Sequence, residues 1–463
     1  MSSVGMATGV EIDMAVETLI VGAGAAGMVA ALAVRETGRE VMVLERDPVP
    51  AGSTALSAGL IPAAGTRFQR PAGIEDTPDL FAADIMKKAS GEPDPALVSL
   101  LAREAATTIE WLADRFGLPF SLVDDFDYPG HARRRMHGLP SRSGAELVDR
   151  LRAACESAGV DLVYGRRADR LHADKAGRVT ALAVEAPDGG QEVIGCGRLI
   201  LACNGFGANP DLVRAHMPEI GDAIYFGHPG NCGEALDWGI ALGAATRHLG
   251  AYQGHGNVAH PHGILITWAT ITEGGMQVNA AGRRFWNEAQ GYSEAARAVL
   301  AEPGGTAVTV FDHRIAGIAR QFADFQAAEA AGAVRSGETL DDIAAIFGLP
   351  SQSLAGEVAA IADAIGLGGS DRYGRAWAKV APLSPPYCGV RVTGALFHTQ
   401  GGLVVDQSAR VLRPDGSALP NLFAAGGAAC GVSGSGDAGY LSGNGLLSAV
   451  VLGRLAGLAG GAL

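Results

Sequence analysis

Three closely spaced glycines and one acid have the types and spacing needed to hold a dinucleotide. Gly22, Gly24 and Gly27 directly follow the apolar segment Glu17–Val21, and Glu45 comes later in the chain. In such a pattern the glycines allow a tight turn, close approach of a pyrophosphate and close packing of a helix on a strand. An acid about 20 residues further on accepts hydrogen bonds from a ribose. The spacing therefore predicts a dinucleotide site.

The segments around these residues have the pattern of a strand, a helix and a second strand. An alanine-rich run extends from the glycines to about Thr37, Gly38 is placed to end it, and Glu40–Leu44 is apolar. The N-terminus of such a helix faces the phosphates of a bound dinucleotide. A second glycine pattern, Gly434–Gly439, has no following strand and no acid, so we interpret it as a loop. A single dinucleotide site favours bound FAD without a separate nicotinamide domain.

Composition and charge narrow the class of protein. The chain has 463 residues, of which 48% are hydrophobic, so it can form two or three domains, or one large domain with an insertion. The formal net charge of −13 argues against nucleic acid or an anionic membrane as a partner. Six scattered cysteines without a C-x-x-C pair favour reduced thiols in a cytoplasmic protein.

The two ends of the sequence carry no pattern of a membrane protein. Residues 1–16 lack the basic start and the apolar run of a secretory signal. The apolar tail 446–463 is interrupted by Arg454 and is rich in glycine, which predicts a buried helix and no membrane span.

The middle of the chain contains both strand and helix patterns. Helical patterns dominate 315–365, where Thr339–Asp342 has the form of a capping box that begins a helix. Strands are expected at 160–164, 179–184, 198–207, 403–406 and 422–425, with a polar turn at 174–178 between the first two. These patterns predict an α/β fold: a Rossmann-type FAD-binding domain built from 1–255 and 386–463, with an inserted α+β cap at 256–385.

Three segments resemble the fumarate reductase/succinate dehydrogenase flavoprotein superfamily. Residues 52–59 resemble its loop along the flavin, 273–288 the hallmark of its inserted cap, and 439–447 its C-terminal flavin-facing block. The resemblance implies FAD contacts at Gly22, Gly24, Ala25, Ala26, Gly27, Glu45, Arg46, Gly52, Ser53, Thr54, Ser57, Ala58, Gly59, Ala168, Ala202, Asn204, Gly205, Gly426, Gly427, Asn444, Leu446 and Leu447. It implies non-covalent FAD, because Thr54 takes the place of the histidine that carries flavin covalently in respiratory members. Many members also carry an acid where this chain has Gly427.

Two tyrosines occupy positions where the fumarate reductases of this superfamily have active-site arginines. Tyr440 takes the place of an arginine that grips a substrate carboxylate, and Tyr292 that of a proton-donating arginine. Arginine offers a charged fork of donors to a carboxylate, whereas a phenol offers one neutral donor that suits a ketone oxygen. The pair is similar to that of the 3-ketosteroid Δ1-dehydrogenases, which implies that Tyr440 and Tyr292 are catalytic.

The same resemblance implies further residues at the substrate. The backbone N–H groups near Gly443 and Gly445 are expected to hold the ketone oxygen beside Tyr440. His398, with Phe397 before it, matches a superfamily substrate motif shifted by one residue. A tyrosine with an ordinary pKa near 10 is a poor base, so another group must assist Tyr292. The candidates are Tyr128, His131 and His137, of which we also assign His137 to the substrate.

Other histidines and arginines are weaker candidates for function. His255, His260 and His262 lack a carboxylate or cysteine at ligand spacing, so no metal site is expected. The run Arg133–Arg135 is either a solvated face or an anchor for a carboxylate-bearing substrate.

The expected reaction is α,β-dehydrogenation of a ketone, most plausibly cyclic, to an enone. Tyr292 takes the α proton, flavin N5 accepts hydride, and an external acceptor (quinone, electron-transfer protein or oxygen) removes the electrons. One alternative is reduction of an activated C=C bond in an unsaturated acid, with Arg133–Arg135 or Arg283–Arg284 as carboxylate clamp. The other is a non-catalytic, electron-carrying flavoprotein subunit.

Overall fold

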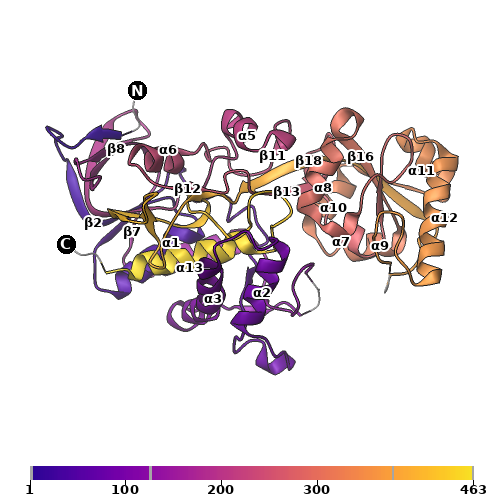
Figure 1. Cartoon of the computed structure of the whole chain (residues 1–463), viewed down its shortest axis with the longest axis horizontal. Helices are drawn as coiled ribbons and strands as arrows, with labels where there is room; N and C mark the ends of the chain where they lie inside the picture. The colour runs from indigo at the N-terminus through magenta and orange to yellow at the C-terminus, as the bar shows by residue number, and fades with distance from the viewer. Residues whose placement is uncertain (1–3, 125–127, 378–379, 461–463) are drawn as a thin grey trace. The chain divides into compact units, whose positions relative to one another are not determined.

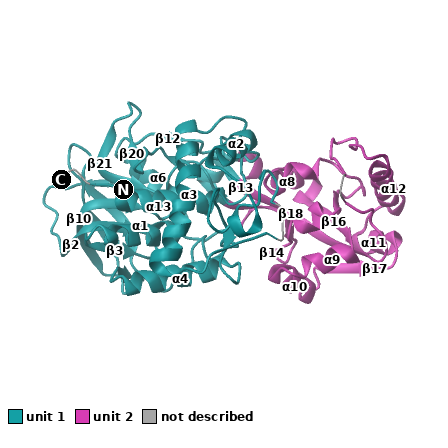
Figure 2. Cartoon of the chain, turned by 90° about the horizontal axis from the view of Figure 1, so that it is seen from below, with its two compact units in different colours: residues 1–217, 227–252, 398–463 teal, residues 218–226, 253–397 magenta. Residues whose placement is uncertain are grey.

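The computed structural model describes residues 4–124, 128–377 and 380–460, which form two compact units (Figure 2). Unit 1 comprises Met1–Met217, Gly227–Tyr252 and His398–Leu463, and unit 2 comprises Pro218–Phe226 and Gln253–Phe397. Unit 2 contains the expected cap, 256–385, and extends beyond it. The extension has a clear cause, because Ile224 pairs with Ala395 in the sheet of unit 2 and both therefore belong to it.

The main sheet of unit 1 has a parallel centre. β2 pairs in parallel with β3 on one side and with β10 on the other, and β10 also pairs with β21. Residues 19–21 and 41–44 are buried runs, as expected for strands covered on both faces. The strands are β1 (Val4–Met6), β2 (Met14–Val21), β3 (Val41–Leu44), β7 (Asp161–Val163), β8 (Arg167–Ala173), β9 (Val179–Glu185), β10 (Gln191–Leu201), β20 (Arg410–Leu412) and β21 (Ala418–Ala424).

One strand pairing differs from the expectation. β9 follows the turn at 174–178, but its hairpin partner is β8, whereas β7 pairs in parallel with β3. The sequence of β8, Arg-Ala-Asp-Arg-Leu-His-Ala, alternates polar and apolar residues and is rich in charge, so it lacks the continuous apolar run that marked its neighbours.

Helices cover the main sheet, and two of them pack without intervening bulky side chains. α1 (Ala25–Glu36) and α13 (Asn444–Leu458) lie side by side (Figure 1). A Cβ at Gly453 would collide with the carbonyl oxygen of Ala26, so the helices approach to backbone contact. The other helices of unit 1 are α2 (Pro78–Lys88), α3 (Pro95–Phe116), α4 (Gly144–Ser157), α5 (Pro210–His216) and α6 (Glu234–Ala241). Short pairings join β4 (Ile61–Pro62), β6 (Met136–Gly138) and β5 (Ser121–Leu122), and β12 (Thr246–Arg247) with β19 (Gly402–Leu403).

Unit 2 is built on a sheet around the long strand β18. Its strands are β11 (Ile224–Tyr225), β13 (Tyr252–Ala259), β14 (Ile264–Leu265), β15 (Met276–Val278), β16 (Thr306–Asp312), β17 (Val334–Gly337) and β18 (Tyr387–Thr399). Its helices are α7 (Ala269–Thr272), α8 (Tyr292–Leu300), α9 (His313–Ala319), α10 (Ala323–Ala330), α11 (Leu340–Phe347) and α12 (Ser351–Leu367). The expected capping box is present, because Thr339 and Asp342 each bond the backbone of the other at the start of α11. β17 interrupts the region that we expected to be helical.

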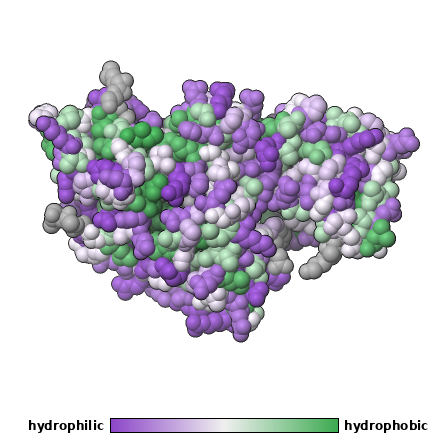
Figure 3. Space-filling model, viewed as in Figure 1, coloured by the Kyte–Doolittle hydropathy of each residue, from purple (hydrophilic) through white to green (hydrophobic). Residues whose placement is uncertain are grey.

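The surface carries hydrophilic and hydrophobic residues intermixed. Hydrophilic residues cover much of the face drawn in Figure 3, with hydrophobic residues scattered among them. Within 4–124, 128–377 and 380–460, no helix is both long enough and apolar enough to cross a membrane.

Candidate functional site

The carboxyl ends of the parallel strands bring the expected dinucleotide residues to one edge of the sheet. β2, β3 and β10 run in parallel and end at Val21, Leu44 and Leu201, so the residues after them meet. A Cβ at Gly22, whose φ is +104°, would lie 2.5 Å from the carbonyl oxygen of Ala202. The residues that follow β2, β3 and β10 therefore lie together and form a cradle built from three segments of the chain.

The cradle is open where a phosphate would approach. A Cβ at Gly27 would collide with the carbonyl oxygen of Gly22, which explains the close helix packing there. At Gly24 a Cβ would meet only the Thr54 hydroxyl, at 3.4 Å. Gly24 is also the N-cap of α1 and has no side chain to cap it, so the helix begins here with the N–H groups of Ala25 and Ala26, of which that of Ala25 donates to the Thr54 hydroxyl.

Glu45 lies at the end of β3 and is fixed by two backbone bonds. Its carboxylate accepts the N–H of Ala23 at 2.9 Å and that of Asp47 at 3.0 Å. The N–H of Arg166 donates to the carbonyl of Glu45, which places the start of β8, and therefore Ala168, beside it. The guanidinium of Arg46 turns away to the carbonyl of Gly230 at 2.8 Å.

The loop 52–59 lies against α1 and against the turn after β10. The Thr54 hydroxyl accepts the N–H of Ala25 at 3.1 Å, and Ser57 donates to the Thr54 carbonyl. Asn204, whose φ is +68°, donates from its amide to the Ser53 hydroxyl at 2.7 Å. The structure therefore brings Ala25, the loop and Asn204 together.

Gly427 is glycine for a steric reason. A Cβ there would collide with the amide oxygen of Asn204, and one at Gly205 would collide with the Thr399 hydroxyl. The acid that many superfamily members carry at this position has no room here, because Asn204 takes its place.

The N-terminus of α13 has an unsatisfied polar atom. The Oδ1 atom of Asn444 is buried and has no hydrogen-bond partner among the described residues, while its Nδ2 atom is 3.4 Å from the Ser433 hydroxyl. A buried acceptor without a partner is costly. The open glycine cradle and this orphaned oxygen are the features that a bound dinucleotide with a polar ring would fill, so the residues present fit FAD.

Tyr440 is a buried phenol held at the same helix N-terminus. The backbone N–H groups of Gly443 and Gly445, at the start of α13, hydrogen-bond its oxygen. Burial raises its pKa to about 12, so the hydroxyl remains protonated at neutral pH. The structure therefore brings Tyr440, Gly443 and Gly445 together.

The ring of His398 packs beside that of Tyr440. Its ring lies 5.9 Å from that of Tyr440, edge to face, and a Cβ at Gly445 would be 2.6 Å from its Nε2. Nδ1 lies 3.0 Å from the Thr399 carbonyl, and the Gln400 amide nitrogen lies 2.8 Å from Nδ1 and 3.0 Å from Nε2. Burial lowers the pKa of His398, so the ring is neutral.

The segment 128–137 packs against the residues that follow Tyr440. Tyr128 packs in a cluster with Met136, and the Nε2 of His131 donates to the Ser442 carbonyl at 3.0 Å. His137 lies in strand β6, not in the loop where we expected it, and its Nε2 is 2.8 Å from the Thr66 hydroxyl. Burial lowers the pKa of both histidines to about 4, so both are neutral.

Tyr292 begins α8 within an aromatic cluster of unit 2. The His255 ring stacks on it at 5.0 Å with an interplanar angle of 19°, and Trp268 meets it edge to face at 6.3 Å. Phe397 continues the cluster, stacked on Phe226 at 4.8 Å and tilted against His255 at 5.4 Å. Burial lowers the pKa of His255 to about 3, so its imidazole is neutral.

Two of the arginines that we considered as carboxylate clamps, Arg135 and Arg284, form ion pairs with acids of the protein. Arg135 is fully buried and bonds Asp76 at 2.8 Å and Asp84 at 2.6 Å. Arg284 is buried and bonds Glu288 at 2.5 Å and also Asp371. Among the described residues, no group of three or more histidines, cysteines or acids could hold a metal ion.

Two contacts at the candidate site had no signal in the sequence. His255 is far from Tyr292 along the chain, and its proximity to other histidines pointed only to a metal. Asn231, whose amide Nδ2 lies 3.1 Å from the Ser53 hydroxyl, stands in a loop without any motif.

Comparison with known proteins identifies relatives along nearly the whole chain. The sequence model described as "FAD binding domain" matches residues 17–446. The protein named "Probable fumarate reductase Ifc3" of Shewanella frigidimarina is 30% identical over 445 residues, which cover 95% of this chain and 74% of that protein.

Two other relatives carry names of ketone dehydrogenases. The 4-oxocyclohexanecarboxylate 2-dehydrogenase of Sinomonas cyclohexanicum is 24% identical, over 96% of this chain and 94% of that protein. The crystal structure of 3-ketosteroid-Δ4-(5α)-dehydrogenase from Rhodococcus jostii RHA1 superposes with a TM-score of 0.79 at 24% identity and covers 99% of both chains. At this identity the superposition establishes a shared fold.

Proposed function

This chain belongs to the FAD-binding flavoprotein family that includes the fumarate reductases, and from this premise we propose that it desaturates a cyclic ketone to an enone. Its cofactor is FAD, which we propose to be bound non-covalently, because Thr54 offers only a hydroxyl and that hydroxyl already accepts the Ala25 N–H. Bound FAD supplies a two-electron acceptor for the hydride that leaves the carbon β to the carbonyl. An external acceptor, a quinone, an electron-transfer protein or oxygen, then regenerates it.

The observation that carries the proposal is the environment of Tyr440. A neutral hydroxyl that accepts from the N–H groups of Gly443 and Gly445 is polarised by them and becomes a stronger donor. Such a donor stabilises the charge that develops on a carbonyl oxygen when the α proton leaves. A carboxylate would instead require a cation, and Tyr440 provides none.

Tyr292 is proposed as the base that accepts the α proton. Stacking against His255 and the edge of Trp268 restrict the orientation of its ring. His255 stacks on the ring face, and its Nδ1 accepts the N–H of Asn257 at 3.2 Å. Within unit 2, we therefore assign to His255 the task of fixing the base.

A ring ketone is the favoured substrate class for two further reasons. The relative from Sinomonas is named for a dehydrogenation of a substituted cyclohexanone, and this chain covers 94% of its length. The buried arginines Arg135 and Arg284 are each paired with two acids, which leaves them unsuited to grip the reacting end of a dicarboxylate.

Anaerobic titration of the purified flavoprotein tests the proposal. Saturated cyclic ketones should bleach the visible flavin band, and Tyr292→Phe should abolish the bleaching while FAD stays bound. Bleaching by succinate-type acids alone would contradict the proposal.

A second candidate function is reduction of an activated C=C bond in an unsaturated acid. It is favoured by the 30% identity to a protein named as a fumarate reductase. Reoxidation of the chemically reduced enzyme by fumarate, but not by cyclic enones, would select this function.

A further inference from the structure

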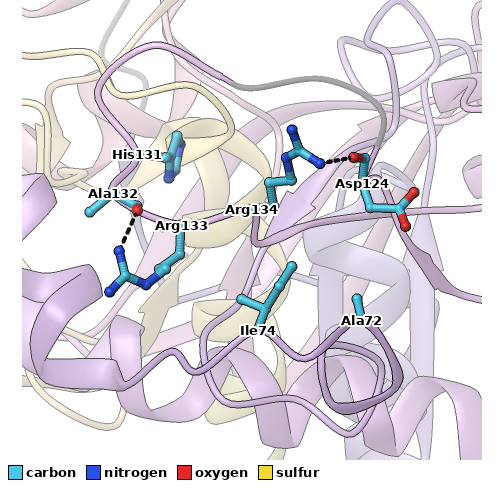
Figure 4. Close-up of a pocket in the computed structure, with 7 residues that line it drawn as sticks. All are labelled: Ala72, Ile74, Asp124, His131, Ala132, Arg133 and Arg134. Atoms are coloured by element: carbon cyan, nitrogen blue, oxygen red, sulfur yellow. Dashed lines mark hydrogen bonds between the residues drawn. The ribbon is translucent and has the colours of Figure 1, made fainter.

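Unit 1 contains a pocket outside the residues assigned above to the ketone. The pocket, of about 660 Å³, is drawn in Figure 4 and is lined by Ala72, Ile74, Asp124, His131, Ala132, Arg133 and Arg134. Its wall combines small apolar side chains with two guanidinium-bearing residues. The volume is sufficient for part of a small organic molecule.

Arg133 forms no ion pair with any of the residues that the structure describes. Its Nε donates to the Glu75 carbonyl at 3.1 Å and its Nη1 to the Ala132 carbonyl at 2.9 Å. Both acceptors are backbone oxygens, so the bonds orient the guanidinium without neutralising it. By contrast, Arg135, two residues later, has its charge compensated by Asp76 and Asp84.

The arrangement of the lining residues favours an anion near Arg133. In Figure 4 the side chain of Arg133 extends on one side of the pocket, and Asp124 lies on the other side, where its backbone carbonyl accepts from Arg134. The carboxylate of Asp124 is therefore separated from Arg133, and the two do not form an ion pair. Among the described residues, the Nη2 of Arg133 has no hydrogen-bond acceptor, and a guanidinium with N–H groups left to donate is a preferred partner for a carboxylate.

The pocket lies close to the residues around Tyr440, with His131 between them. His131 lines the pocket, and its Nε2 donates to the carbonyl of Ser442, which lies between Tyr440 and Gly443 in the chain. Next to it, a Cβ at Gly130 would lie 2.7 Å from a methyl group of Leu441. One end of the pocket is thus formed by a residue that contacts the loop carrying the ketone-binding groups.

We propose that Arg133 binds a carboxylate on the substrate, so that the substrate is a cyclic keto acid with its ketone at Tyr440 and its acid group in this pocket. The inference rests on the proposed ketone dehydrogenation and adds the substrate class. Here the carboxylate is an anchor remote from the reacting carbons, in contrast to the fumarate reductases, where an acid is attached to them.

The test compares charged and neutral versions of one substrate. Cyclohexanones carrying a carboxylate at ring position 3 or 4, and the matching carboxamides, are titrated into the holoenzyme, with binding measured by calorimetry and flavin reduction by absorbance. The wild type should bind the acid about ten times more tightly than the amide, as expected for one partly exposed charge-assisted contact. Arg133→Gln should weaken binding of the acid about ten-fold and leave the amide unchanged.

The matched control is Arg103→Gln, which removes an exposed arginine of α3 in the same unit. It should leave binding of both compounds unchanged. Arg133→Lys, which keeps the charge, should restore part of the preference for the acid. Equal binding of acid and amide by the wild type, or an equal loss of both in Arg133→Gln, would overturn the inference.

The two proposals fail in different ways. If the acid binds in an Arg133-dependent manner but no ketone reduces the flavin, the dehydrogenation is wrong and the carboxylate site stands. If neutral ketones reduce the flavin and Arg133→Gln changes nothing, the dehydrogenation stands and the carboxylate site is wrong.

Discussion

Removal of one oxygen atom, in Tyr440→Phe, is the sharpest perturbation of the proposed chemistry. The hydroxyl is buried, is protonated because burial raises the pKa of the phenol to about 12, and accepts from Gly443 and Gly445. Phenylalanine keeps the ring and its edge-to-face contact with His398. The substitution therefore deletes the donor with little change in packing.

The expected loss follows from what the hydroxyl contacts. Deleting one buried donor that stabilises a developing oxyanion lowers kcat by roughly 100- to 1,000-fold, or about 3–4 kcal/mol. In the folded protein, the N–H groups of Gly443 and Gly445 lose their acceptor, which costs about 1–3 kcal/mol of stability. FAD content should be unchanged, because the cradle at Gly24 and the loop 52–59 are untouched.

The assay is anaerobic stopped-flow reduction of the flavin by a saturated cyclic ketone, from pH 6 to about 10. Since the pKa of Tyr440 lies near 12, the ratio of wild-type to variant rates should be constant across this range. Tyr164→Phe is the matched control, because Tyr164 lies in the same unit and its hydroxyl has no hydrogen-bond partner among the described residues. It should react at the wild-type rate.

The reasoning would be refuted by a variant that keeps its FAD and reduces it within about three-fold of the wild-type rate. The ketone oxygen would then be held by other groups. A ratio of rates that changes strongly between pH 6 and about 9 would also contradict the assignment, because Tyr440 would then ionise in that range.

Three further predictions concern the cofactor cradle, the cap and the buried histidines. Gly24→Val should abolish FAD binding, measured as flavin absorbance per protein, because the side chain enters the open space above α1; Gly317→Ala, also in open space, should not. His255→Ala should lower kcat about ten-fold with KM nearly unchanged, since Tyr292 loses its stacked partner, and His255→Phe should recover much of the rate. An equally slow His255→Phe would exclude stacking as the reason. Burial lowers the pKa of His137 from 6.5 to about 4, so the folded protein holds this ring neutral. In urea unfolding, its contribution to the free energy of unfolding should be full above pH 6.5. That contribution should then fall by about 1.4 kcal/mol per pH unit as the pH decreases toward 4. His137→Gln should remove that share of the slope; an unchanged slope would contradict the buried neutral ring.

The nucleotide-binding half of the fold could be predicted from the sequence because its signals are local. The run from Glu17 to Glu45 contains a strand, a glycine turn, a helix and a strand in immediate succession, and the structure forms β2, α1 and β3 there. The capping box at Thr339 was equally local. β8 was missed, because strand pairing compensates for its charged residues only once β9 lies beside it.

The sequence by itself determined which chemical groups are present at positions defined by a motif, such as Tyr440, Tyr292, Thr54 and Gly427. Motifs are carried by residues adjacent in the chain, whose relative positions the backbone already fixes.

Only the tertiary structure decided what those groups contact. In the run Arg133–Arg135, three identical side chains are equivalent in sequence, yet Arg135 is buried between Asp76 and Asp84, whereas Arg133 is exposed and lines a pocket. The contact in which His255 stacks on Tyr292 likewise exists only in the tertiary structure. Burial and pairing depend on segments that come together only when the chain packs, so no pattern along the sequence distinguishes one arginine from its neighbour.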